Sequence, residues 1–276
     1  MQDGLLPLKQ TVRHLLEPPL PLHIDVVGPV HHHLGDFTSP CTDHYRYVQV
    51  APLRPNDDQP DEKGAATMKL TTTTMVTVDG VMQGLGGPDE DRRGGFERGG
   101  WVTPYADNEG MAFLNEVYGR ADVFLFGRRT YEIFADSWGT WPDPGDSPIW
   151  TALNTRPKYV ASTTPFDPKW ANTTVLSGDV AAAIRELKAK AGGELQVHGS
   201  GVLVRWLLDN DLVDEINLLT IPVVVGQGTR LFPDTGRDIA LELVGSQAVT
   251  PSGATIHVYH PAGRPQYGTA TVDMNT

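Results

Sequence analysis

The sequence predicts an α/β protein of three layers, in which helices cover both faces of a mostly parallel central sheet. From about residue 68 onward, strand-like and helix-like segments alternate along the chain. Strands that are joined by helices of this length pair in parallel. Near the C-terminus, two strand-like segments flank the short turn TPSG, which predicts an antiparallel C-terminal hairpin at one edge of the sheet.

The first elements follow from local patterns. The β-branched run KLTTTTMVTV predicts a strand over residues 69–78, and a glycine-rich loop follows over residues 89–107. Residues 108–120 place apolar side chains on one face behind a capping Asp107 or Asn108, which predicts a helix. The apolar run ADVFLFG predicts a buried strand over residues 121–127, and RRTYEIFADSW predicts a short helix over residues 128–138.

The remaining elements complete the sheet. Short strands are expected over residues 157–163 and 173–178, and the clearest helix begins at its cap Asp179 and ends at Gly192 and Gly193. The other expected elements are a strand over 194–199, a helix over 200–211, a long strand over 214–226, and the hairpin strands over 241–249 and 254–260.

Composition divides the chain into three parts. Residues 1–67 are rich in proline and histidine and end in a polar, charged run, so we interpret them as a poorly ordered extension or an over-long start. Residues 68–262 are the expected folded domain, and residues 263–276 a flexible tail. The stretch with His31, His32, His33, Cys41 and His44 matches no usual zinc spacing, so we expect no metal site.

The overall charge and the cysteine content restrict the function. A formal net charge of −12 argues against general binding to nucleic acid or anionic membranes. Cys41 is the only cysteine, so no internal disulfide can form and a cytoplasmic protein is expected. No apolar run approaches the roughly 20 residues of a membrane span, and the N-terminus lacks the pattern of a secretory signal. We therefore expect a small-molecule substrate as partner.

Two strand-to-helix turns are candidate anion sites. In FLFGRRTYE, Gly127 ends a strand and Arg128, Arg129 and Thr130 open a helix, where free N–H groups and guanidinium groups favour phosphate. The alternative is that the arginines are surface charges paired with Glu132 or Asp136.

The second turn lies in LQVHGSGVLVRWLL. Gly199, Ser200 and Gly201 follow a strand and lead into a helix, and these small residues let a phosphate or ribose approach the backbone. A plain tight turn explains them equally well. We interpret the neighbouring His198 as a packed strand residue.

Further candidates lie in the other loops. Asp79 and Gly80 follow the first strand, either as a simple turn or as substrate-orienting groups, with Asp79 the candidate catalytic residue. Gly226 and Arg230 are candidate substrate-binding residues in PVVVGQGTRLF. Trp101 either stacks on a flat substrate ring or anchors its loop to the core.

The region from Met68 to about His260 resembles the dihydrofolate-reductase-like superfamily. More closely, it is similar to the branch that includes the C-terminal reductase domain of the bifunctional riboflavin-biosynthesis enzyme. Three motifs carry the resemblance in the same order and spacing: TVDGV, FLFGRRTYE, and VHGSGVLVRWLLDNDLVDEINLLTIPVVVGQGTRLF.

The resemblance implies a dihydrofolate-reductase-like fold that binds NADPH. It implies that the turn from Gly127 to Thr130 holds the adenosine-side phosphates and that Ser162 lies near the 2′-phosphate. The segment that cradles the pyrophosphate and the nicotinamide ribose would comprise Gly199, Ser200, Gly201, Val202 and Leu203.

The function implied by the resemblance is NADPH-dependent hydride transfer to a C=O or C=N bond of a small heterocyclic or carbonyl substrate. Reduction of 5-amino-6-(5-phosphoribosylamino)uracil in riboflavin biosynthesis is one such reaction. The alternatives are a nucleotide-binding module without catalysis and a true pterin or dihydrofolate reductase. The resemblance also implies a homodimer, with the strand over residues 214–225 and the C-terminal hairpin near its interface.

Overall fold

The computed structural model describes residues 67–248 and 252–269. Its helices are α2 (Asn108–Arg120), α3 (Arg128–Ser137), α4 (Pro148–Thr155), α5 (Val180–Lys188) and α6 (Gly201–Asp209). Its strands are β1 (Lys69–Thr77), β2 (Ala121–Gly127), β3 (Lys158–Ala161), β4 (Thr173–Leu176), β5 (Glu194–Val197), β6 (Glu215–Ile221), β7 (Leu241–Ala248) and β8 (Thr255–Pro261).

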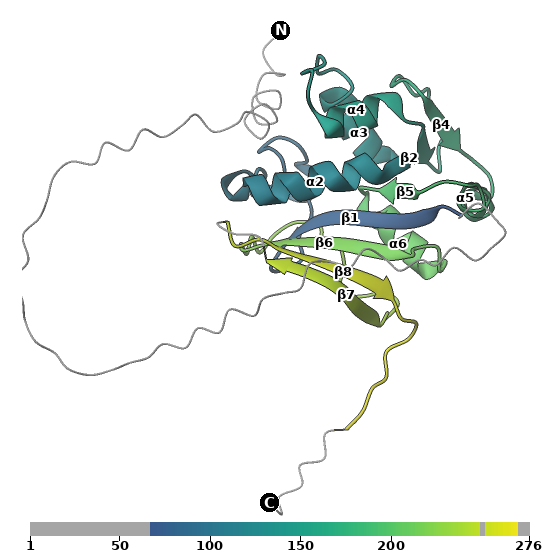
Figure 1. Ribbon diagram of the computed structural model, residues 1–276. Helices are drawn as coiled ribbons and strands as arrows, with labels where there is room; N and C mark the ends of the chain where they lie inside the picture. Colours follow the sequence, from purple (N-terminus) through teal and green to yellow (C-terminus); the bar gives the residue numbers. More distant parts are fainter. Residues whose placement is uncertain (1–66, 249–251, 270–276) are drawn as a thin grey trace, which may run out of the picture.

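The strands form a single sheet in the order β4-β3-β2-β5-β1-β6-β8-β7 (Figure 1). The six strands from β4 to β6 pair in parallel. Strand β8 pairs antiparallel with both β6 and β7, so the C-terminal hairpin lies at one edge. The predicted fold class is therefore confirmed: a three-layer α/β architecture with a mostly parallel sheet and an antiparallel hairpin.

Alternation along β2 explains why helices cover both faces. Val123 and Leu125 point into one apolar cluster, which also contains residues of α5 and α6. Phe124 and Phe126 point into the opposite cluster, with residues of α2, α3 and α4. Because successive side chains of a strand face opposite sides, a strand that is apolar throughout needs cover on both.

Beside small shifts at the ends of other elements, the structure differs from the sequence-based prediction mainly in two elements. Strand β6 ends at Ile221 instead of continuing to residue 226, because Pro222 has no N–H to donate to a neighbouring strand. Helix α4 was not predicted; Ser147 caps it by accepting a hydrogen bond from Trp150 N at 3.2 Å, and Pro148 occupies its first turn.

Several expectations fall outside the described residues. These include residues 1–66 of the expected extension, with its histidines and Cys41, and residues 270–276 of the expected tail. The proposed domain boundaries stay predictions. Within the described residues, no helix has both the length and the apolar character that crossing a membrane requires.

Candidate functional site

The sheet has a crevice between the carboxyl ends of β2 and β5. These strands are neighbours, with Leu125 paired to Val197. The helices that follow them pack on opposite faces of the sheet: α3 contributes to the apolar cluster on one face and α6 to the cluster on the other. Such a switch point opens a crevice between two loops and is where open α/β sheets bind ligands.

The helix that follows β2 begins without a side-chain cap. Gly127 is its N-cap residue and offers no side chain to the free N–H groups of the first turn. Arg128 and Arg129 stand in this turn although no acidic residue accompanies them there. The combination of free N–H groups, a positive dipole end and two cations favours an anion.

The helix that follows β5 begins in the same way. Ser200 is the N-cap residue of α6 and makes no side-chain capping hydrogen bond. Gly127 N donates to Gly199 O at 3.0 Å, which joins the two turns directly. A Cβ on Gly127 would lie 2.4 Å from Ser200 Oγ, and one on Gly199 would lie 2.9 Å from Thr130 Oγ1. The small residues therefore let the two turns come together.

Both turns open into a cleft of about 1340 Å³. Loop residues 162–166 and residues 177–181 around the start of α5 line it on the side of β3 and β4. On the other side lie apolar residues of α2 and of β6, β8 and their loops: Met111, Leu114, Leu219, Ile221, Ala254 and Ile256. The volume exceeds the roughly 300–1,000 Å³ of a typical small-molecule site, so the cleft has room for more than one small molecule.

Arg128 is tied into one wall of this cleft. Its Nε donates to Glu132 at 2.9 Å, its terminal nitrogen donates to Thr164 Oγ1 at 2.7 Å, and its guanidinium lies 4.9 Å from the centre of the Phe166 ring. Arg128 therefore does pair with Glu132, as the alternative interpretation of the sequence has it. Arg129 has a looser contact with Glu132, at 4.0 Å.

Glu90, in the glycine-rich loop, brings an ionisable carboxyl to the cleft. It is half-buried, and its Oε2 accepts a hydrogen bond from Gly86 N at 2.9 Å. Burial raises the pKa of Glu90 to about 7, and the neighbouring charge of Asp91 adds to the rise, while Arg129 opposes it. Such a carboxyl exchanges a proton near neutral pH.

With this geometry established, comparison with known proteins identifies the family. The sequence pattern of the RibD C-terminal domain matches residues 68–254, which is most of the chain. The chain belongs to the RibD C-terminal domain family.

A relative in this comparison is YyaP, an uncharacterized protein of Bacillus subtilis (strain 168). It is 27% identical over 198 residues, a match that covers 70% of this chain and 94% of YyaP. Among solved structures, a protein of Shewanella sp. PV-4 assigned to riboflavin biosynthesis has a TM-score of 0.50 at 22% identity, over 70% of this chain and 99% of that chain. A dihydrofolate reductase of Enterococcus faecalis, solved with NADP(H) and RAB-propyl, has a TM-score of 0.47 at 15% identity, over 71% of this chain and 98% of that chain.

The sequence-predicted cofactor residues of this RibD C-terminal domain protein converge on the cleft. Its lining includes Gly127, Arg128, Arg129, Thr130, Ser162, Ser200, Gly201, Val202 and Leu203. Gly199 is not part of this lining; a Cβ added to it would lie 2.9 Å from Thr130 Oγ1. Their role in holding a cofactor stays a prediction.

The predicted catalytic residue Asp79 and the predicted substrate-binding residues Gly226 and Arg230 lie together outside the cleft. The Asp79 carboxylate accepts hydrogen bonds from Thr77 Oγ1 at 2.6 Å and from the backbone N–H groups of Val225 and Gly226 at 3.2 and 2.8 Å. Arg230 Nε donates to Asp79 O at 2.8 Å. Desolvation opposes the shift, but the hydrogen bonds that the carboxylate accepts lower the pKa of Asp79.

This Asp79 cluster braces two turns and does not line the cleft. Gly80 has a φ of +79° and its N–H donates to Thr77 O at 2.8 Å, so the turn interpretation of Asp79 and Gly80 is confirmed. The contacts favour a structural role, and catalysis by Asp79 stays a prediction.

Trp101 belongs to the core under the glycine-rich loop. Its side chain is buried among apolar residues and its Nε1 donates to Gln83 O at 2.8 Å. The Gln83 amide in turn donates to Arg93 O at 2.9 Å and accepts from Thr229 N at 2.9 Å. The anchoring interpretation of Trp101 therefore agrees with these contacts, and the ring does not line the cleft.

Sequence reasoning did not place Glu90 or Phe166 at the cleft, and it interpreted His198, which also lines the cleft, as a packed strand residue. Glu90 and Phe166 lie in loops, and no local sequence pattern indicates which part of the domain a loop residue contacts. Among residues 67–248 and 252–269, no group of histidine, cysteine, aspartate and glutamate side chains is arranged to hold a metal ion.

Proposed function

We propose that the protein is an NADPH-dependent reductase that transfers hydride to a C=O or C=N bond of a small heterocyclic or carbonyl substrate. The observation that supports it most directly is the pair of uncapped helix N-termini, on neighbouring strands, that open into one cleft beside two arginines. Membership of the RibD C-terminal domain family supports a reductase-type activity. Reduction of 5-amino-6-(5-phosphoribosylamino)uracil is one reaction within this proposal.

The residues of the cleft fit a phosphorylated dinucleotide. The α6 turn from Gly199 to Leu203 would hold the pyrophosphate with backbone N–H groups, and the α3 turn would hold the adenosine-side phosphates. Ser162 would lie near the 2′-phosphate. Bound NADPH supplies the hydride from its nicotinamide ring, while the protein supplies orientation and excludes water.

Arg128 and Arg129 have different roles in this proposal. Arg128 is already held by Glu132, Thr164 and Phe166, so it stiffens the wall of the cleft. The 4.0 Å contact between Arg129 and Glu132 is longer than a hydrogen bond. Arg129 can therefore turn its guanidinium to a phosphate at little cost, and we expect it to contact the 2′-phosphate of NADPH directly.

Titration with NADPH and, separately, with NADH tests the cofactor. Trp138 and Trp206 line the cleft, so quenching of tryptophan fluorescence reports binding. We expect Arg129→Ala to weaken NADPH binding roughly 10- to 100-fold, since it removes a charge-assisted hydrogen bond of about 1.5–3 kcal/mol, and to affect NADH much less. Arg185→Ala, at an exposed site on α5 outside the cleft lining, is the matched control.

An equal loss for the two nucleotides would refute the 2′-phosphate role of Arg129. Failure of both nucleotides to bind the wild type would refute the proposed function. NADPH binding without oxidation by any carbonyl or imine compound would favour the non-catalytic module. Oxidation by dihydrofolate with methotrexate inhibition would favour a true dihydrofolate reductase.

The homodimer remains part of this proposal. Leu243 and Val244 of the edge strand β7 are exposed, with accessible fractions of 53% and 43%. Apolar side chains on an edge strand are a liability unless a partner covers them. Light scattering that gives the mass of a monomer at all protein concentrations would refute the dimer.

A further inference from the structure

His198 lies where β5 runs into the α6 turn, and its side chain lines the cleft. Its ring stacks on Tyr118 of α2, with centroids 4.2 Å apart and planes at 17°. Tyr118 is buried, so it holds the imidazole from one side. What the imidazole offers to the cleft depends on which of its nitrogens carries the proton.

The side chain of Gln196 fixes this tautomer. Its Nε2 lies 2.6 Å from both Val117 O and Glu194 Oε2. Both partners are acceptors, so the amide nitrogen must occupy this position and the amide oxygen must point the other way. That oxygen lies 3.2 Å from His198 Nε2. Because an amide oxygen only accepts, Nε2 of His198 is the protonated nitrogen.

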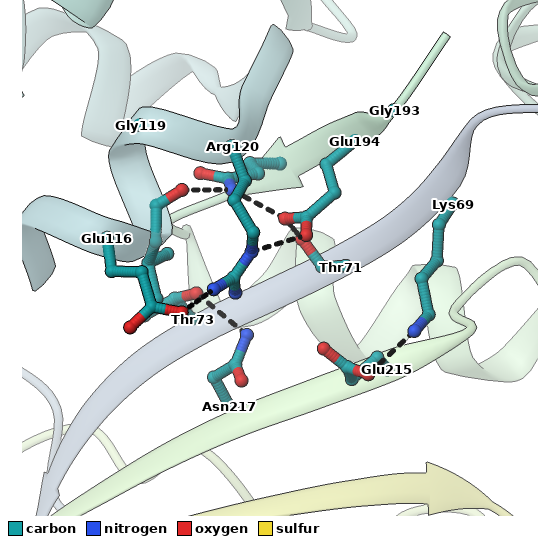
Figure 2. Close-up of polar contacts among 12 residues, drawn as sticks. Lys69, Thr71, Thr73, Glu116, Gly119, Arg120, Gly193, Glu194, Glu215 and Asn217 are labelled. Atoms are coloured by element: carbon teal, nitrogen blue, oxygen red, sulfur yellow. Dashed lines mark hydrogen bonds and ion pairs between the residues drawn. The ribbon is translucent and has the colours of Figure 1, made fainter. Parts of the chain in front are cut away.

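A charged network keeps Gln196 in this orientation. Glu194 accepts hydrogen bonds from Arg120 Nε at 2.8 Å and from Thr71 Oγ1 at 3.2 Å, and Arg120 also bonds Glu116 at 2.8 Å (Figure 2). A flipped amide would place its oxygen against the Glu194 carboxylate and the Val117 carbonyl. The network therefore opposes the flip, and the imidazole keeps its proton on Nε2.

The other ring nitrogen then carries a lone pair. Burial lowers the pKa of His198 to about 3, so the ring is neutral at physiological pH. No residue in the described part of the chain donates a hydrogen bond to Nδ1. Nδ1 is also not one of the buried polar atoms without a partner, so it stays accessible from the cleft. A fixed acceptor thus stands at the wall of the cleft.

We propose that His198 Nδ1 accepts a hydrogen bond from a ring N–H, amino or hydroxyl group of the substrate, and that Gln196 positions it for this role. The inference rests on the proposed function, because it assigns substrate selection within the same cleft. A carbonyl or an ether oxygen offered at this position would meet a lone pair, so the site rejects substrates that present only acceptors there.

Nitrogen NMR of the ligand-free protein tests the tautomer. In a long-range ¹H–¹⁵N correlation of labelled protein, the signals of His198 are those that disappear in His198→Phe, which keeps a ring against Tyr118. We expect a neutral imidazole protonated at Nε2. In Gln196→Met, which removes the amide oxygen, we expect a mixture of tautomers. An Nδ1-protonated or a charged ring in the wild type would overturn the proposal.

Binding of a matched pair of probes tests recognition. Lumazine is a fluorescent heterocycle with ring N–H groups, and 1,3-dimethyllumazine lacks them. We expect the wild type to bind lumazine roughly tenfold more tightly than 1,3-dimethyllumazine, because only lumazine can donate a hydrogen bond to Nδ1. We expect His198→Phe to bind the two probes equally. Gln196→Met should keep part of it. Circular dichroism confirms that each variant is folded.

The titrations are done with and without NADPH, so that the two proposals fail separately. If the wild type does not bind NADPH, the proposed function is refuted. The preference for lumazine over 1,3-dimethyllumazine still tests the role of His198 in that case. A wild type that binds NADPH but binds neither probe, or binds both equally, overturns the role of His198. A preference that survives in His198→Phe overturns it as well.

Discussion

Replacing Glu90 by glutamine tests the electrostatics of the cleft through the stability of the fold. The carboxyl is half-buried beside Asp91, and only the Gly86 and Leu85 backbone and the charge of Arg129 favour its ionised form. Glutamine has nearly the same shape and keeps an acceptor for Gly86 N, but it carries no charge at any pH. The comparison therefore isolates the cost of holding a negative charge at this position.

The magnitude follows from the pKa. Its rise from 4.5 to about 7 means that the folded protein binds a proton more tightly than the unfolded chain between these values. Stability then falls as the pH rises from about 4.5 to about 7, and the full penalty is present above pH 7. At about 1.36 kcal/mol per tenfold change in proton affinity, the upper bound is about 3 kcal/mol. Partial exposure of the side chain reduces this to roughly 1–2 kcal/mol.

Urea denaturation near pH 4 and near pH 8 measures the effect. We expect Glu90→Gln to match the wild type in acid and to be more stable by roughly 1–2 kcal/mol in mild alkali. Glu97→Gln, which changes an exposed carboxyl of the same loop, serves as the control. A difference between Glu90→Gln and the wild type that is the same at both pH values would refute the reasoning.

Two further substitutions test the remaining assignments. Gly127→Ala would place a Cβ 2.4 Å from Ser200 Oγ and 3.0 Å from Ser200 N, so it should push the two turns apart and weaken NADPH binding at least tenfold in the fluorescence titration; unchanged affinity would mean that the turns do not hold the cofactor. Asp79→Asn removes the charge that holds the N–H groups of Val225 and Gly226, so it should lower stability by roughly 1–3 kcal/mol with little change in kcat. A large fall in kcat with an unchanged melting temperature would instead make Asp79 catalytic.

Local signals in the sequence were sufficient for several elements. The helix over residues 108–120 and the strand over residues 121–127 have the bounds that were predicted. Asp107 accepts from Gly110 N at 2.7 Å as a capping residue, and the apolar run of β2 is buried on both faces. These features depend on neighbours in the chain, which is why the chain alone reveals them.

Other elements were missed although part of their signal is local. Ser147 followed by Pro148 is a helix start, and α4 begins there. The end of β6 at Ile221 follows from the missing N–H of Pro222. The apolar residues after Pro222 extended the predicted strand too far, and the segment of α4 received no prediction at all.

The candidate site divides in the same way. The sequence by itself determined the two glycine-containing turns and the two arginines of the first, because each turn is a property of one strand and the helix that follows it. Tertiary structure alone decided that β2 and β5 are neighbours, that the Glu90 loop returns over the cleft, and that Gln196 fixes the proton of His198. These facts depend on contacts between segments far apart in the chain, which the packing of the whole sheet selects and no local pattern encodes.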